Sequence, residues 1–255
     1  MNGPLLETRA LRVAVPNRLL VDDLNLTIGA GEFIALLGGN GTGKSLLLRT
    51  LAGLRAASAG EVLLGGAPIA QRARKEVATR LGFLPQDPDA PPQGTLRESV
   101  LLGRFAHLGL WDVADADDAT RVARALEATA LESFADRELA TLSGGEQRRA
   151  AIARLLVQAP SIYLLDEPTN HLDPAQQLGI LEKLRALTRT GAAVVASLHE
   201  PNLALRFADR ACLLANEGAT QVIPCGALDA AQLKRLYGLH YLQLQAGARR
   251  FVTPE

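Results

Sequence analysis

The sequence has few cysteines and no excess of charge of either sign. Only two of its 255 residues are cysteine, Cys212 and Cys225, and their spacing fits neither a zinc site nor a disulfide framework. We expect both to be small buried side chains in a reducing compartment rather than a redox pair. The 27 basic and 27 acidic side chains cancel. This balance argues against nucleic acid as a partner, because such binding needs a basic surface.

Long apolar segments are also missing. A membrane-spanning helix needs about 20 mostly apolar residues, whereas runs such as Phe33–Leu37 and Ile162–Leu165 end early at loops or charges. Residues Met1–Ala10 include a glutamate and lack the apolar stretch of a signal peptide. We therefore expect a protein without a membrane span, so that the pore of any transport function belongs to another chain.

What the sequence does have is an alternation of strand and helix patterns. Leu24, Leu26 and Ile28 alternate with polar residues, and Phe33–Leu37 has the continuous apolar character of a strand buried in a parallel sheet. Further strands are predicted at Glu61–Leu64, Leu81–Leu84, Ile162–Leu165, Ala192–Ser197, Ala211–Leu214 and Tyr241–Leu244. Helical patterns between them, at about 44–54 and from 174 onward, predict an α/β fold with a mainly parallel sheet covered on both faces.

The middle of the chain has a different character. Asp87–Gln93 is rich in proline, and helical patterns follow, including an acidic first turn around Asp115. Carboxylates at that place stabilise the helix dipole, so we interpret the acidic cluster as a capped helix. The sequence predicts one domain over 1–255, in which a helical subdomain at about 87–158 is inserted into a core formed by 1–86 and 159–255.

A phosphate-binding loop is predicted after the strand Phe33–Leu37. The chain reads Gly38-Gly39-Asn40-Gly41-Thr42-Gly43-Lys44-Ser45, which matches the pattern GxxxxGK[ST] between a buried strand and a helix. Glycines let the backbone N–H groups face inward, and the helix N-terminus adds positive potential. We expect Lys44 to reach the β- and γ-phosphates of a nucleotide and the hydroxyl of Ser45 to bind Mg²⁺. An ordinary glycine-rich turn is the alternative, and the strand–loop–helix context disfavours it.

Two acids end the strand Ile162–Leu165. Ligands of open α/β sheets bind at the carboxyl ends of the strands, where Asp166 and Glu167 fall. We expect Asp166 to hold Mg²⁺ through water, and Glu167 to polarise the attacking water as a general base and thus to be catalytic. The alternative is a solvated acid pair at the start of a loop.

A second glycine-rich helix start gives the family resemblance. Leu142-Ser143-Gly144-Gly145-Glu146-Gln147 precedes a helical pattern at Arg148–Gln158 and resembles the signature of ABC ATPases. Taken alone, the string could be a simple helix cap with Ser143 at the N-cap. With the phosphate loop and the acid pair around it, the resemblance implies an ABC ATPase fold. This is a P-loop NTPase (RecA-like) core with an N-terminal antiparallel β subdomain and an inserted helical subdomain.

The resemblance also implies how the motifs work together. Two copies would pack head-to-tail, and residues Leu142–Glu146 of each would close on ATP in the other. Gln86 resembles the Q-loop glutamine, which touches Mg²⁺ and links to the transport partner, and Asp173 resembles the D-loop aspartate at the subunit interface. His199 resembles the H-loop histidine, so that it and Lys44 are catalytic and stabilise the γ-phosphate. The implied cofactors are ATP and Mg²⁺.

One departure concerns adenine. The family places an aromatic residue near the N-terminus to stack on the base, but there is none between Leu11 and Leu20. Val13 is expected at that position, and Arg18 is the nearest planar cation. Both are therefore predicted nucleotide contacts.

A narrower resemblance concerns cargo. Leu102-Gly103-Arg104-Phe105-Ala106-His107 and the segment from His199 to Ala204 are similar to ATPases of iron–siderophore, haem and vitamin B12 importers. The predicted function is ATP hydrolysis that powers import of such a metal chelate. The expected partners are membrane permease subunits, a second copy of the chain and, indirectly, a substrate-binding protein, and the expected location is cytoplasmic, peripheral on the inner face of the cell membrane. A soluble ABC ATPase of an assembly machine, such as iron–sulfur cluster assembly, or an exporter ATPase remains the alternative.

Overall fold

The computed structural model of the chain describes residues 3–86, 93–108, 115–247 and 249–255. Most of the proline-rich segment at 87–93, where the sequence predicts the start of the helical subdomain, lies outside the described residues.

The largest sheet contains six strands. Their bounds are β4 (Phe33–Leu37), β7 (Leu81–Leu84), β8 (Ile162–Leu165), β9 (Ala193–Ser197), β10 (Arg210–Leu214) and β11 (Thr220–Pro224). The order is β11-β10-β4-β9-β8-β7, and all neighbours are parallel except the edge pair β10–β11. Every residue of β4, β8 and β9 is buried, as expected where helices cover both faces. The predicted parallel sheet is confirmed, and the carboxyl ends of its strands meet at one edge.

A smaller antiparallel sheet lies at the N-terminal part of the chain. Its strands are β1 (Leu6–Val15), β2 (Arg18–Leu24), β3 (Thr27–Ile28), β5 (Ala59–Leu64) and β6 (Ala67–Pro68). The long strand β1 pairs antiparallel with β2, β3 and β5. The tight turn between β1 and β2 uses Asn17 at φ 61°, a left-handed conformation that asparagine tolerates. The alternation at 24–28 spans the end of β2 and β3 rather than one strand.

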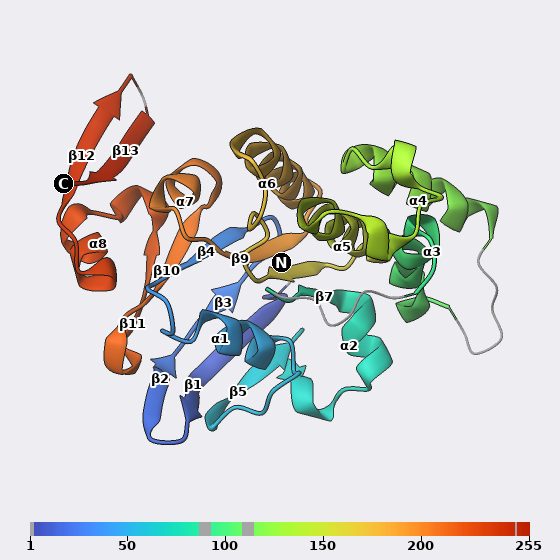
Figure 1. The fold of residues 1–255 in the computed structure, drawn as a ribbon. Coiled ribbons are helices and arrows are strands. Elements are labelled where there is room, and N and C mark those ends of the chain that lie inside the picture. Colours follow the sequence, from blue (N-terminus) through green and yellow to red (C-terminus); the bar gives the residue numbers. More distant parts are fainter. Residues whose placement is uncertain (1–2, 87–92, 109–114, 248) are drawn as a thin grey trace.

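Helices pack on both faces of the parallel sheet. Their bounds are α1 (Lys44–Leu51), α2 (Arg74–Arg80), α5 (Gly144–Gln158), α6 (Pro174–Arg189) and α7 (Pro201–Phe207). Figure 1 shows α5, α6 and α7 on one side of the strands and α1 and α2 on the other. Alternate residues of β4 enter two cores: Phe33 packs with residues of α5 and α6, and Ile34 with residues of α1 and the antiparallel sheet.

A helical unit sits beside the sheets, at the right of Figure 1. It contains α3 (Leu96–Leu101), α4 (Ala116–Ala128) and part of α5, which share a third core cluster of residues between Leu96 and Val157. Asp115 caps α4, because its carboxylate accepts a hydrogen bond from the backbone N–H of Asp118 at 2.9 Å. The capped helix predicted from the acidic cluster is therefore confirmed.

The C-terminal segment adds α8 (Ala230–Tyr237) and a hairpin of β12 (Tyr241–Ala246) and β13 (Arg249–Pro254). The side-chain amide of Asn202 in α7 donates to Val252 O at 2.9 Å and accepts from Val252 N at 2.8 Å, which fixes β13 against α7. The sequence predicts a strand at Tyr241–Leu244 but not its partner β13. Short 3₁₀ turns connect other elements, at Ile69–Gln71, Leu102–Ala106, Glu132–Phe134, Leu139–Thr141, Asn216–Gly218 and Cys225–Ala227.

Both cysteines lie in the apolar cores. Cys212 is 0% and Cys225 3% exposed, and burial raises the pKa of each thiol to about 12. The expectation of small buried side chains is therefore confirmed. Within the described residues, no helix is long and apolar enough to cross a membrane.

Candidate functional site

The phosphate loop connects β4 to α1, as the motif predicts. Lys44 opens α1, and its ammonium donates to the carbonyls of Gly38 and Gly39 at 2.7 and 3.0 Å. The side chain is buried, and this desolvation lowers the pKa of Lys44, although the charges of Glu167 and Asp166 act in the opposite direction. A buried ammonium aimed back over its own loop is held where an anion placed in the loop would meet it.

Glycine is sterically required at two places in this loop. A Cβ added at Gly38 would lie 2.5 Å from the carbonyl oxygen of Leu214. Gly43 has φ +100°, and its Cβ would lie 2.8 Å from Cβ of Leu20. The loop therefore folds tightly against β10 and β2, in a conformation that a residue with a side chain could not adopt at these two places.

A cavity of about 370 Å³ opens in front of the loop. Its lining combines the loop with residues from distant parts of the sequence: Leu20, Asn40, Gly41, Gly43, Lys44, Ser45, Leu46, Gln86, Glu167 and His199. The structure thus brings most of the predicted loop, the predicted Q-loop glutamine, the predicted general base and the predicted H-loop histidine to one site at the carboxyl edge of the sheet.

The acid pair at the end of β8 is held by Ser197 of β9. The hydroxyl of Ser197 donates to Asp166 Oδ1 at 2.7 Å and accepts from the backbone N–H of Glu167 at 2.8 Å. Asp166 is only 1% exposed and lies behind the cavity rather than in its lining. This placement suits a carboxylate that reaches a cation through water better than one that binds it directly.

Glu167 has an unusual backbone and two side-chain partners. Its φ is 50°, in the left-handed region that costs a non-glycine residue about 1–3 kcal/mol. Gln86 Nε2 donates to Glu167 Oε2 at 3.0 Å, and His199 Nε2 lies 2.6 Å from Glu167 Oε1. The carboxylate is therefore fixed at the cavity by groups that follow the two strands on either side of β8, in a position where it can accept a proton from water.

Asp173 lies away from this cavity, at the start of α6. Its carboxylate accepts from the backbone N–H of Gln176 at 2.8 Å, and Pro174 takes the first helical position. Asp173 is therefore the N-cap of α6. The interface role of Asp173 stays a prediction.

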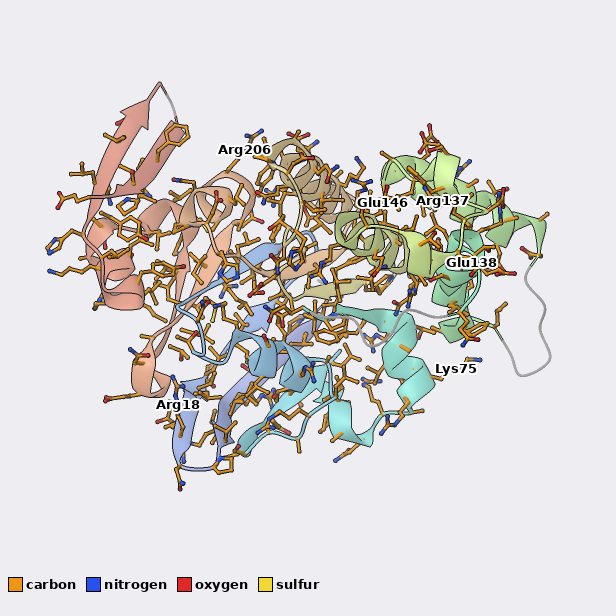
Figure 2. The ribbon with its side chains drawn as sticks, in the orientation of Figure 1. Arg18, Lys75, Arg137, Glu138, Glu146 and Arg206 are labelled. Carbon is orange, nitrogen blue, oxygen red and sulfur yellow. The ribbon has the colours of Figure 1, made fainter. Side chains whose placement is uncertain are left out.

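The predicted signature forms the N-terminus of α5, and the helix begins four residues earlier than the predicted Arg148. Ser143 and Glu146 form a capping box: Ser143 N and Oγ donate to Glu146 Oε2 at 2.7 and 2.8 Å. These bonds lower the pKa of Glu146. Leu142 is buried in the helical unit, whereas a Cβ placed on Gly144 would meet no described atom within 4 Å beyond its chain neighbours and the backbone of its own helix. Figure 2 shows Glu146 far from Arg18, which adjoins the phosphate loop, so the chain does not fold its signature onto its own loop.

The expectation for Val13 is wrong. Its side chain is 0% exposed and packs in the core between the two sheets, so it has no surface for a base. The adjacent turn instead leaves Arg18 exposed, with Nη1 3.7 Å from a Cβ placed on Gly41. Val15 ends β1, is half-buried and pairs with Arg18, so Val15 rather than Val13 borders this surface.

Sequence reasoning missed two residues that hold the site. Ser197 fixes the acid pair, and buried Arg148 donates to backbone carbonyls of the acid pair and of Gln86. A hydroxyl at the end of a strand next to the acid strand is a weak signal for Ser197. Arg148 directly follows the signature, but an arginine there looks like an ordinary exposed helix residue.

The importer-like segment at 102–107 has a structural explanation. A Cβ on Gly103 would lie 2.3 Å from Arg154 O, so glycine allows close packing on α5. Arg104 Nε bonds Asp118 at 2.6 Å, and His107 Nε2 lies 2.7 Å from Gln158 O at the end of α5. These residues join the helices of the unit to one another, so packing is a sufficient explanation for them.

Comparison with known proteins gives the family. Residues 21–170 match the family model described as "ABC transporter". The chain is 43% identical over 209 residues to the probable siderophore transport system ATP-binding protein YusV of Bacillus subtilis (strain 168), with 82% of this chain and 76% of the relative covered. It is 40% identical to the ferric enterobactin transport ATP-binding protein FepC of Escherichia coli (strain K12), with 86% and 82% covered. It is 39% identical to the hemin import ATP-binding protein HmuV of Myxococcus xanthus (strain DK1622), with 92% and 90% covered.

Comparison with solved structures supports the same family. A chain of an ABC transporter in an inward-facing conformation, provisionally classed as the metal-chelate type, matches with a TM-score of 0.84 at 28% identity and covers 100% of this chain and 98% of its own length. The protein cbiO1 of Clostridium perfringens, part of the ABC transporter complex cbiONQ, matches with a TM-score of 0.74 at 27% identity, with 88% and 89% covered. These matches bear out the predicted P-loop ABC fold and the catalytic class. The chain belongs to the ABC transporter family and is one of its ATP-binding, ATP-hydrolysing members.

Proposed function

We propose that this chain is the ATPase subunit of an importer and powers uptake of a metal chelate, of the ferric siderophore or haem kind, through separate permease subunits. The observation that carries the ATPase role is the position of Glu167, held at the phosphate-loop cavity between Gln86 and His199. The cargo class rests on the relatives, whose names refer to siderophore, enterobactin and hemin transport.

The residues of the cavity have the following proposed roles. The loop Gly38–Ser45 binds the phosphates of ATP through its backbone N–H groups, and Lys44 leaves its loop carbonyls to meet the β- and γ-phosphates. Glu167 orients the attacking water and accepts its proton, while His199 contacts the γ-phosphate. The fold of one chain brings these groups to the same cavity, and donors placed there would stabilise the charge that develops on the phosphates during reaction.

Mg²⁺ fits the donors present. Ser45 and Gln86 line the cavity with a hydroxyl and an amide oxygen, and Asp166 lies behind them with a fixed carboxylate. Oxygen donors of these kinds, together with waters and phosphate, are the ligands that Mg²⁺ prefers. Bound there, the cation would neutralise charge on the phosphates.

A second copy is proposed to complete the site. Residues Ser143–Gly145 are the exposed start of a helix, and this end of α5 can bind an anion that approaches from outside. Since Figure 2 places Glu146 away from Arg18, the anion would be the γ-phosphate of ATP held by the other copy. Asp173, on the neighbouring helix α6, is proposed to lie at the same interface. Closure and reopening of such a pair would drive the permease on the inner face of the membrane.

The first experiment identifies the partner and the cargo together. Tagged Glu167→Gln protein is loaded with ATP and used to purify partners from detergent-solubilised native membranes, with Lys44→Ala protein as the matched control that fails to hold ATP. A polytopic membrane protein recovered at one-to-one ratio with Glu167→Gln only, which on reconstitution accumulates a ferric siderophore or haem in vesicles at the expense of ATP, supports the proposal. Recovery of soluble assembly proteins alone contradicts the transport role and favours the assembly-machine ATPase.

A further inference from the structure

A buried arginine connects the signature helix to the site of hydrolysis. Arg148 lies five residues after Ser143 on α5 and is 4% exposed. Its Nη1 donates to Pro85 O at 2.5 Å and to Gln86 O at 3.0 Å. Its Nη2 donates to Asp166 O and, at 2.8 Å, to Glu167 O. One guanidinium therefore holds the two chain segments that leave β7 and β8 at the carboxyl edge of the sheet.

These four acceptors are backbone carbonyls, so the bonds fix the main chain of both segments. The planar guanidinium presents its donors in a rigid fork, which allows it to join two segments at once. One of the carbonyls belongs to Glu167, whose left-handed backbone needs support from its surroundings. Ser197 binds the N–H of Glu167 from β9, and Arg148 binds its carbonyl from α5. The orientation of the general base therefore depends on where α5 lies.

A second contact links the same helix to the chain after the acid pair. A Cβ placed on Gly145 would lie 3.1 Å from the carbonyl oxygen of His171. The first turn of α5 thus packs directly on the segment between Glu167 and Asp173. The first turns of α5 therefore contact the chain that follows β8 at two places, near Glu167 through Arg148 and at His171 through Gly145.

We propose that Arg148 is a positioning residue that couples the two ATP sites of a pair. The inference rests on the proposed function, in which Ser143–Gly145 contacts ATP held by the second copy. Five residues of α-helix span about 7.5 Å, so α5 would touch the partner's ATP at one end and hold the chain's own Glu167 and Gln86 through Arg148. Closure of the signature on one ATP therefore sets the general base at the other site. Each site becomes competent only when both are filled.

The test is the ATP dependence of hydrolysis by full-length wild type and Arg148→Lys. Lysine keeps the charge but loses the fork, so it cannot hold both segments. We expect the wild-type Hill coefficient to approach 2, the number of sites. In Arg148→Lys we expect a Hill coefficient of 1 and a kcat reduced at least tenfold. The affinity of the phosphate loop, measured with a fluorescent ATP analogue, should stay within about twofold because Lys44 and its loop are untouched.

Two control variants separate coupling from general damage. Arg154→Lys changes another partly buried arginine of α5, whose Nη2 donates to Ser99 Oγ of α3 at 2.9 Å, away from the nucleotide. It should keep the cooperativity. Ser197→Ala loosens Glu167 from β9 without touching α5, so it should lower kcat and leave the Hill coefficient unchanged. Arg148→Gln replaces the lysine variant if the latter does not fold.

The outcomes distinguish the inference from the function on which it rests. The coupling role alone is overturned if wild type is cooperative and Arg148→Lys is equally cooperative. It is also overturned if Arg154→Lys loses cooperativity to the same extent as Arg148→Lys. A wild type that does not hydrolyse ATP, or that does so with a Hill coefficient of 1 at every protein concentration, overturns the paired-site function itself. Loss of cooperativity in Arg148→Lys alone supports the coupling.

Discussion

Two helices of this chain begin at glycine-rich segments, and the surroundings of the two segments differ. The loop before α1 is enclosed: Lys44 is buried, Gly38 and Gly43 are pressed against neighbouring strands, and a cavity lies in front. The start of α5 is open: Ser143 and Glu146 cap the helix with each other, and a Cβ on Gly144 would meet no described atom within 4 Å from outside its own helix and chain neighbours. Both helix starts are predicted to bind an anion, but only the loop before α1 is enclosed by neighbouring residues.

This difference indicates which steps a single chain can carry out without a second copy. In the enclosed site, Lys44, Glu167 and His199 of one chain line the same cavity, so we expect ATP to bind there without a second copy. The open helix start supplies N–H groups and a dipole but no residue that grips a nucleotide. We therefore expect the loop variants to affect binding by a single chain, and the signature variants to affect only steps that need two chains.

The largest expected effect is at Glu167. Glu167→Gln keeps the shape of the side chain and one acceptor oxygen but cannot accept a proton, so turnover should fall by about 10²–10⁴-fold while ATP binding persists. Steady-state ATPase assays measure the loss, and size-exclusion chromatography with ATP detects the trapped pair. Glu200→Gln, an exposed neighbour of His199, is the control and should hydrolyse normally. Turnover of Glu167→Gln within threefold of wild type would contradict the general-base role.

The second prediction compares the two helix starts by making the same glycine-to-alanine substitution in each. Gly43→Ala meets Leu20 at 2.8 Å and forces φ +100° on alanine, so it should lower the free energy of unfolding by about 1–3 kcal/mol and weaken ATP binding more than tenfold. Gly144→Ala has open space and helical backbone, so the free energy of unfolding should change by less than about 0.5 kcal/mol.

Binding and turnover then separate the two variants. Gly144→Ala should bind ATP like wild type but hydrolyse it at least tenfold more slowly, because the added methyl occupies the surface proposed for the partner's phosphate. Chemical denaturation, nucleotide titration and ATPase assays on both proteins are sufficient. Normal turnover by Gly144→Ala would show that the open helix start does not contact ATP.

Most of the enclosed site follows from the sequence, since the phosphate loop and the acid pair depend on local order. A buried strand must deliver Gly38–Ser45 and Asp166–Glu167 to the same sheet edge, whichever helices cover it. Contacts between segments that are distant in the sequence could not be predicted in this way. The hydrogen bonds of Arg148 with carbonyls near Gln86 and Glu167, and the bridge made by Ser197, exist only once three strands and α5 are packed.

The fold shows the same division. Strands β4, β7 and β8 have the predicted bounds because apolar runs bounded by turns are strong local signals. The helix α2 was not predicted, since none of its side chains is buried and it has no apolar stripe. The misplacement of Val13 has a related cause: an alternating strand pattern does not show which of Val13 and Val15 ends at the surface, and the register shifts on either side of Val13 decide it.

A smaller effect is expected at the cap of the open helix. Ser143→Ala removes the hydroxyl of the capping box and should lower the free energy of unfolding by about 1 kcal/mol. Its turnover should fall by more than this loss of stability accounts for. Asp115→Ala removes the N-cap of α4, where the carboxylate accepts from Asp118 N, and is a matched control outside the site. Thermal unfolding should shift alike in both proteins, and ATPase activity should fall only in Ser143→Ala. Equal ATPase activity in the two variants would reduce Ser143 to a helix cap.

The smallest effect concerns the base of ATP, at the outer side of the enclosed loop. Arg18 is exposed beside Gly41, and a guanidinium stacked on adenine contributes about 0.5–1 kcal/mol, so Arg18→Ala should weaken ATP binding by about two- to fivefold. Tripolyphosphate, used as a competitor, has no base and should bind both proteins equally. Arg12→Ala, which removes an exposed arginine bonded to Asp22 on the same strand pair, should change neither affinity. If Arg18→Ala weakened the binding of tripolyphosphate as much as the binding of ATP, the guanidinium would act on the phosphates. Adenine would then have no contact from this turn.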